Sequence, residues 1–227
     1  MSEAEITPED RGLDPSEMGE EEKGDNKITA GEKEIKLEDG ESIKFPTVEV
    51  ERMHLFIGKT ESGLVEVPEA YETTVGDGVY LTSQQEAAEG YALRRSKGGV
   101  SSVPTVYKVE IQNLSLLDLT TQEAQEKFTS YWKEQLLKLR EELVHKEWSA
   151  KEAAVDQAIL NINTNSIRGL RDITFSFGNL VRDTFKREGF DGLTIEEGGE
   201  GRGEIGNHDS YVIFNPREVR IIKEIKI

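Results

Sequence analysis

Apolar and polar residues alternate with a period of two in several short stretches of the chain. The clearest are residues 103–111 and 218–227, and a strand with one buried face shows this alternation. Further strands are predicted from short apolar runs bounded by glycine or proline, at 48–57, 79–81, 190–195 and 211–214.

Other stretches repeat their apolar residues at spacings of three and four, the helical period. These predict helices over 121–160 and 176–188, and the first carries a stripe of Phe128, Trp132, Leu136, Leu139 and Leu143. A shorter helix is predicted to run from Ser83 to about Leu93, with Glu86 completing a capping box. The apolar stripe is too short for a stable coiled coil, so we expect it to pack against its own domain.

Strands therefore cluster towards both ends of the pattern, with helices between them. This order predicts an α+β fold with a split, mainly antiparallel sheet. We expect one domain over residues 46–227, in which 121–188 form a helical insertion. Residues 1–45 are predicted to be an acidic, mostly disordered tail, with a weak strand or an irregular lead-in from residue 30 onwards.

Charge supports the prediction of a tail. Residues 1–50 hold sixteen acidic and six basic residues, and such a segment buries too little apolar surface to offset its ordering entropy. The whole chain has a formal net charge of −17, which makes nucleic acid an improbable partner.

The composition excludes several kinds of functional site. The chain has no cysteine, which excludes disulfides, thiolate catalysis and zinc–thiolate sites, and suits a cytoplasmic location, including the cytoplasm of a host cell. No apolar run approaches the ~20 residues that span a bilayer, and the acidic start of the chain does not resemble a signal peptide. We expect no membrane association.

The stretch most suggestive of chemistry is residues 76–92. A Gly-Asp-Gly turn precedes a short strand that contains Tyr80, and the following helix presents Tyr91. Two tyrosines at such a corner can enclose a planar heterocycle such as nicotinamide by stacking. On spacing alone, two ordinary core aromatic residues are the more frequent explanation.

This stretch resembles the second motif of ADP-ribosyltransferases of the poly(ADP-ribose) polymerase and diphtheria-toxin type, Gly-x-Gly-(Ile/Val)-Tyr-(Phe/Leu) followed by a helix with Ala and Tyr. Residues 55–60 (LFIGKT) and 210–216 (SYVIFNP) stand in the places of the first and last motifs. Residues 189–193 (GFDGL) resemble the strand that precedes the last motif. The four matches occur in the family's order within 50–227, and the chain is similar to modules of phage and mobile-element polyvalent proteins.

The resemblance implies an ADP-ribosyltransferase-like fold and NAD as a substrate. It implies that Gly58 offers its backbone to the nicotinamide carboxamide, because glycine permits close approach, and that Tyr80 and Tyr91 flank the ring. The implied partner is an acceptor protein or another macromolecule.

Two positions depart from the family pattern. Ile57 stands where the family has a histidine that contacts the adenosine ribose, and Ser210 stands where it has the catalytic glutamate. A serine hydroxyl supplies no negative charge to a cation-like transition state. Asp209, brought inward by a bulge, and Glu204 are the candidate replacements, with Glu218 a weaker one.

The three histidines give no metal-binding spacing, so no metal site is predicted. His54 is expected to be exposed or at an edge, and His145 to lie on a helix surface. For His208 two interpretations stay open, contact with a ligand and simple solvation. Gly58-Lys59-Thr60 lacks the upstream glycine of a P-loop and is not interpreted as one.

Three hypotheses follow. The first is an NAD-dependent ADP-ribosyltransferase that modifies a protein or another macromolecule, with glycosyltransferase chemistry. The second is a catalytically inactive module of the same kind that binds a ligand or a partner, because Ile57 and Ser210 replace the expected His and Glu. The third is a structural or virion-associated protein. The sequence leaves the acceptor and the oligomeric state open.

Overall fold

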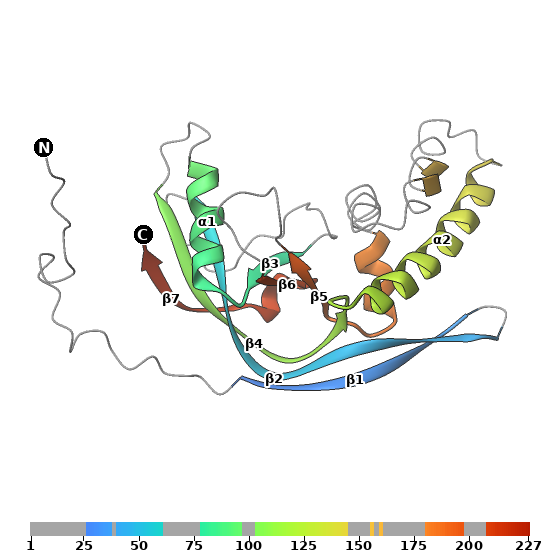
Figure 1. Ribbon diagram of the computed structural model, residues 1–227, viewed down its shortest axis with the longest axis horizontal. Coiled ribbons are helices and arrows are strands. Elements are labelled where there is room, and N and C mark those ends of the chain that lie inside the picture. The colour runs from blue at the N-terminus through green and yellow to red at the C-terminus, as the bar shows by residue number, and fades with distance from the viewer. Residues whose placement is uncertain are drawn as a thin grey trace, which may run out of the picture.

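A computed structural model describes residues 26–37, 40–60, 78–96, 103–144, 155–156, 159–160, 180–197 and 208–227 (Figure 1). Seven of the elements in these ranges are strands of one sheet. They are β1 (Lys27–Lys36), β2 (Ser42–Thr60), β3 (Val79–Thr82), β4 (Pro104–Asp118), β5 (Gly192–Glu197), β6 (His208–Ile213) and β7 (Arg220–Lys226).

The helical elements are α1 (Gln85–Ser96), α2 (Gln122–Val144), the short 3₁₀ turn η2 (Pro216–Glu218) and a helical stretch over 180–187. None of the helices in the described ranges is both long and apolar enough to cross a membrane.

The sheet closes on itself. Its strand order is β1-β2-β3-β6-β5-β4-β7, and β2 also pairs directly with β4. Strands β2, β3, β6, β5 and β4 therefore form a five-stranded barrel, to which β1 and β7 are added as outer strands. Every pairing is antiparallel except β4 with β5.

The prediction of a split α+β sheet of the ADP-ribosyltransferase type was wrong. The finding that overturns it is the long antiparallel ladder between β2 and β4, which runs from Thr47↔Leu117 to Thr60↔Pro104. Strand β4 is longer than the predicted strand at 103–111, and continues to Asp118 past Asn113, whose φ is 54°. Local patterns could not show this, because barrel closure depends on pairing between segments distant in sequence.

Buried residues form two clusters, one on each face of the strands. The cluster within the barrel takes alternate residues of its strands: Met53, Leu55 and Ile57 from β2, Val79 and Leu81 from β3, Tyr107, Val109 and Ile111 from β4, and Tyr211 and Ile213 from β6. Burial along these strands thus has a period of two, the period that predicted the strand at 103–111, whereas the others were predicted from their apolar runs.

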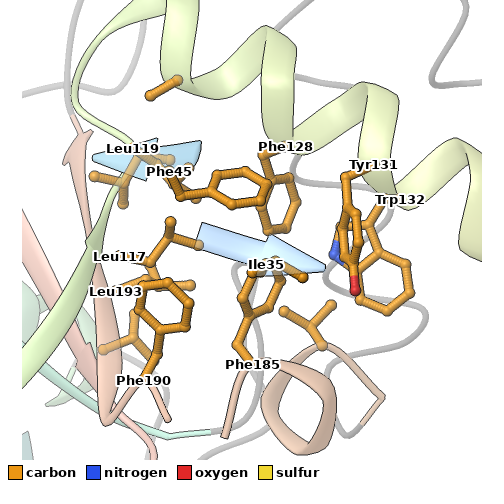
Figure 2. Close-up of a cluster of buried hydrophobic side chains, with 14 of the residues drawn as sticks. Ile35, Phe45, Leu117, Leu119, Phe128, Tyr131, Trp132, Phe185, Phe190 and Leu193 are labelled. Carbon is orange, nitrogen blue, oxygen red and sulfur yellow. The ribbon is translucent and has the colours of Figure 1, made fainter. Parts of the chain in front are cut away.

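The second cluster lies outside the barrel, between the strands and the helices (Figure 2). Aromatic rings dominate it, and Phe185 of the 180–187 helix contacts the rings of Phe45, Phe128, Tyr131, Trp132 and Phe190. Phe128 and Phe185 are stacked at 5.4 Å with an interplanar angle of 15°. Phe128, Trp132, Leu136 and Leu139 of the predicted stripe on α2 belong to this cluster or pack against it.

The helices are consequently no separate insertion. Ile35 of β1 and Phe45 of β2 are 1% and 0% exposed within the same cluster as α2. Removing the helices would expose the outer face of the β1–β2 hairpin, so strands and helices share one core.

Within residues 1–45, predicted to be a mostly disordered tail, residues 27–36 form β1 and residues 42–45 begin β2. Residues 27–36 pair with β2 from Ile28↔Val50 to Lys36↔Ser42, and the proposed boundary falls inside β2. Residues 1–25 lie outside the described residues. In the sequence, the apolar residues Ile35 and Phe45 indicated at most a weak strand. The residues that bury them come from α2 and the 180–187 helix, far away along the chain, so no local pattern could show this burial.

Candidate functional site

Two of the residues predicted to bind a ligand, Gly58 and Tyr80, belong to β2 and β3, which are neighbours in the sheet. Within the described residues these strands share a single register pair, Phe56↔Thr82, whereas β2 pairs with β4 as far as Thr60. Extending the β2–β3 register by two residues sets Gly58 across from Tyr80. Among the pairings of the described strands, the β2–β3 ladder is the shortest.

Helix α1 covers Gly58. A Cβ atom built on Gly58 would run into the backbone oxygen of Ala88, and it would lie 2.9 Å from the carbonyl carbon of Ala88 and 3.0 Å from the nitrogen of Ala92. Glycine is needed here for the contact between strand and helix. The sequence had indicated a close backbone approach by a ligand, and the close approach seen is by α1.

The same helix brings Tyr91 to the site. Tyr91 directly precedes Ala92, whose nitrogen is next to Gly58, so the backbones of Tyr91 and Gly58 are close neighbours. Tyr91 is half-buried. The structure thus brings the backbone of Tyr91 close to Gly58.

Tyr80 has a second role. Its side chain is half-buried and packs against the aromatic cluster outside the barrel, next to Val212, its partner in the β3–β6 register. Tyr80 is therefore partly a core residue, which agrees with the simpler interpretation of its spacing.

His208 is the neighbour of Tyr91 that the sequence did not reveal. Its Nε2 lies 3.3 Å from the Tyr91 hydroxyl, and the two rings meet edge to face at 5.7 Å and 71°. The side chain is 3% exposed, so the interpretation of a solvated histidine is wrong. The signal available beforehand was only its place at the start of β6, two residues before Ser210.

Ser210 lies on the same face of β6 as His208, between Thr82 of β3 and Ile195 of β5. It is 3% exposed. Thr82, which the sequence did not single out, is also buried and accepts a hydrogen bond at its Oγ1 from the Gln84 backbone N–H, 3.2 Å away.

Asp209 points away from this face. The β5–β6 register runs without a shift through Glu196↔Asp209 and Ile195↔Ser210, so the bulge that would turn Asp209 inward is absent from this part of the strand. Asp209 is exposed. The pKa of Tyr211 is raised to about 12, mainly because Tyr211 is buried and in second place because the charge of Asp209 is nearby. Glu204 lies outside the described residues.

Ile57 is 5% exposed and belongs to the cluster within the barrel, on the opposite face from Gly58. His54 is partly exposed, as expected for an edge position, and its Nε2 lies 3.3 Å from Oε2 of Glu110. His145 lies outside the described residues.

Glu218 belongs to a different neighbourhood. Its Oε1 accepts a hydrogen bond from Asn215 Nδ2 at 3.0 Å, and burial, followed by the nearby charge of Asp191, raises its pKa. Among the described residues no group of three or more His, Asp or Glu is arranged to hold a metal ion.

Comparisons with known proteins add little to this geometry. No family model matches the chain, and no curated protein matches it. The chain is similar to a chain in the crystal structure of the M. tuberculosis MbcT-MbcA toxin-antitoxin complex, with a TM-score of 0.41 at 12% sequence identity over 80% of this chain and 86% of that chain. A likeness of this size assigns neither a family nor a function.

Proposed function

We propose that this chain binds NAD, with the nicotinamide ring held at the seam between β2 and β3. The observation that supports the proposal is the packing of α1 against Gly58, which sets the backbone of Tyr91 beside β2. Tyr80 lies on β3, the strand that pairs with β2 at Phe56↔Thr82. Two half-buried phenol rings offer stacking surfaces to a planar heterocycle.

The polar groups beside the seam suit an amide-bearing ring. Thr82, Ser210 and His208 lie on the face of β3 and β6 that Tyr80 also shares. Hydroxyl and imidazole groups both donate and accept hydrogen bonds, as a carboxamide requires. Ligand sites are generally apolar with a few such polar groups.

The first test is NAD binding by titration calorimetry with wild type, Tyr91→Ala and Leu93→Ala. Leu93 is on the same helix and 46% exposed, so Leu93→Ala controls for general effects on α1. We expect Tyr91→Ala to weaken binding roughly three- to tenfold, as the loss of one stacking partner implies, and Leu93→Ala to bind as wild type does. Absence of wild-type binding at millimolar NAD would overturn the proposal.

A second candidate function is transfer of ADP-ribose from bound NAD to a protein. It is favoured by the order of Gly58, Tyr80, Tyr91 and the β6 segment along the chain, which matches that of NAD-consuming transferases. Ser210 lacks the charge that this reaction requires at its position, so the proposal assigns the missing carboxylate to Glu204.

That assignment is tested with NAD labelled in its adenylate half, by following label transfer and nicotinamide release together. Activity that persists in Asp209→Asn and is lost in Glu204→Gln supports the transferase. Binding of NAD by wild type with no nicotinamide release, in the presence of mixed acceptor proteins, leaves binding as the function and rejects transfer.

A further inference from the structure

The contact between Tyr91 and His208 joins two elements that lie far apart in the sequence. Tyr91 belongs to α1 and His208 opens β6, and 117 positions separate them. The hydroxyl-to-Nε2 distance is 3.3 Å and the rings are in edge-to-face contact. This contact fixes the tip and one edge of the Tyr91 ring.

His208 is more deeply buried than Tyr91. The contact therefore restrains the Tyr91 ring more than it restrains the imidazole. His208 is 3% exposed and is paired with Glu197 in the β5–β6 ladder, so its imidazole is held in place. Tyr91 is half-buried on a helix. A half-exposed ring samples several rotamers within nanoseconds, and a hydrogen bond at its tip restricts it to one.

We propose that His208 is a positioning residue that holds the Tyr91 ring in its ligand-binding orientation. This inference rests on the proposed NAD site. Immobilising a rotamer-rich side chain costs affinity when a ligand must do it, and a ring held beforehand removes that cost. The imidazole acts through Tyr91 and needs no contact of its own with the ligand.

The test is a double-mutant cycle on NAD affinity with Tyr91→Phe, His208→Ala and the two together. Tyr91→Phe retains the stacking ring and removes only the hydroxyl, so it isolates the positioning contact. We expect each single change to weaken NAD binding about threefold to tenfold, and the double variant to bind no more weakly than the weaker single variant, as interacting residues do.

Two further variants separate positioning from general stability. His208→Gln places an amide near the position of Nε2, and we expect it to recover most of the affinity lost in His208→Ala. His54→Gln is the matched control, since His54 contacts Glu110 and lies four residues from Gly58 along β2. We expect it to bind NAD as wild type does. Melting temperatures are measured for all variants.

The outcomes are distinguishable. Wild-type binding combined with independent, multiplying effects of Tyr91→Phe and His208→Ala overturns the positioning role and leaves the NAD site standing. Equal NAD affinity of Tyr91→Phe and wild type also overturns the positioning role and leaves the NAD site standing. Absence of binding by wild type overturns both the site and the inference. Coupled losses with recovery by His208→Gln support the positioning role.

Discussion

Gly58 of β2 lies so close to Ala88 of α1 that no side chain fits between them. A Cβ atom at position 58 would be 2.9 Å from the carbonyl carbon of Ala88 and would overlap its oxygen. Backbone atoms of a helix move only if the helix moves. This contact therefore sets the distance of α1, and with it Tyr91, from the seam between β2 and β3.

Gly58→Ala is expected to destabilise the fold by about 1–3 kcal/mol, the usual cost of overpacking, and to weaken NAD binding because α1 shifts. Adding Ala88→Gly should recover nothing, since the obstacle is the backbone of residue 88. Chemical denaturation of the single and double variants measures this.

The control for Gly58→Ala is Gly31→Ala in β1. There the new Cβ would meet a side-chain atom, Oγ1 of Thr47, at 2.7 Å. We expect the stability lost in Gly31→Ala to be regained in part when Thr47→Ala removes that atom. Recovery at position 58 and none at position 31 would contradict the packing described for both.

Lys33 is expected to hold the β1–β2 hairpin on the rest of the domain. Its Nζ donates to the Gly189 carbonyl oxygen at 2.5 Å and lies 4.8 Å from the centre of the Phe190 ring. Lys33→Met keeps the stem and removes the ammonium group, so we expect a loss of about 1–2 kcal/mol in the free energy of unfolding.

Lys27→Met is the matched change for Lys33→Met. Lys27 is on the same strand, but its pair with Glu51 is well exposed, with side chains 59% and 68% accessible. Exposed pairs contribute ~0–1 kcal/mol, so urea denaturation should show a smaller loss. Equal losses at the two positions would argue against a clamp at Gly189.

Glu218→Gln is expected to stabilise the protein at neutral pH. Burial and the charge of Asp191 raise the pKa of Glu218 in the folded state, so the folded state binds this proton more tightly than the unfolded state. Stability from this group is fully present below its ordinary pKa of 4.5 and declines as pH rises through the raised value.

The gain from Glu218→Gln should therefore be present at pH 7 and disappear near pH 4. Glutamine retains an oxygen for the hydrogen bond from Asn215 Nδ2. Glu224→Gln on β7, an exposed position, removes the same charge and controls for the overall net charge. A gain at Glu218 that is independent of pH would contradict the linkage.

Glu110 is expected to matter more than an isolated surface acid. Its side chain is 11% exposed and lies within 4 Å of Arg52, His54 and Arg220, which come from β2 and β7. Glu110→Gln leaves Arg52 and Arg220 without their shared anion, so we expect a loss of about 1–2 kcal/mol. Glu51→Gln, whose partner is exposed, should cost less in the same thermal denaturation assay.

Sequence reasoning placed most strands and helices because burial in this protein follows local periods. Leu55 and Ile57 alternate into the barrel, and the stripe that includes Phe128 and Trp132 packs against the aromatic cluster. The predictions that failed concerned segments whose order depends on pairing with distant residues. Residues 27–36 looked too polar to order, yet they become a strand because β2 offers them a complete ladder.

The candidate site, too, could be predicted from the sequence only in part. The glycine and the two tyrosines were selected from their order along the chain, and the closeness of Tyr91 to Gly58 follows from α1 packing on β2. The partner of Tyr91 was not predictable, because nothing near position 91 in the sequence indicates His208. Asp209 was a reasonable substitute for a missing carboxylate until an unshifted β5–β6 register set it on the other face.

The sequence by itself determined which segments alternate, which repeat with the helical period, and where glycine permits close approach, since these properties depend on neighbours a few residues away. The tertiary structure alone decided that five strands close into a barrel, that the helices share its outer core, and that His208 meets Tyr91. Those features depend on pairings between distant segments, whose register is chosen by the packing of the whole domain.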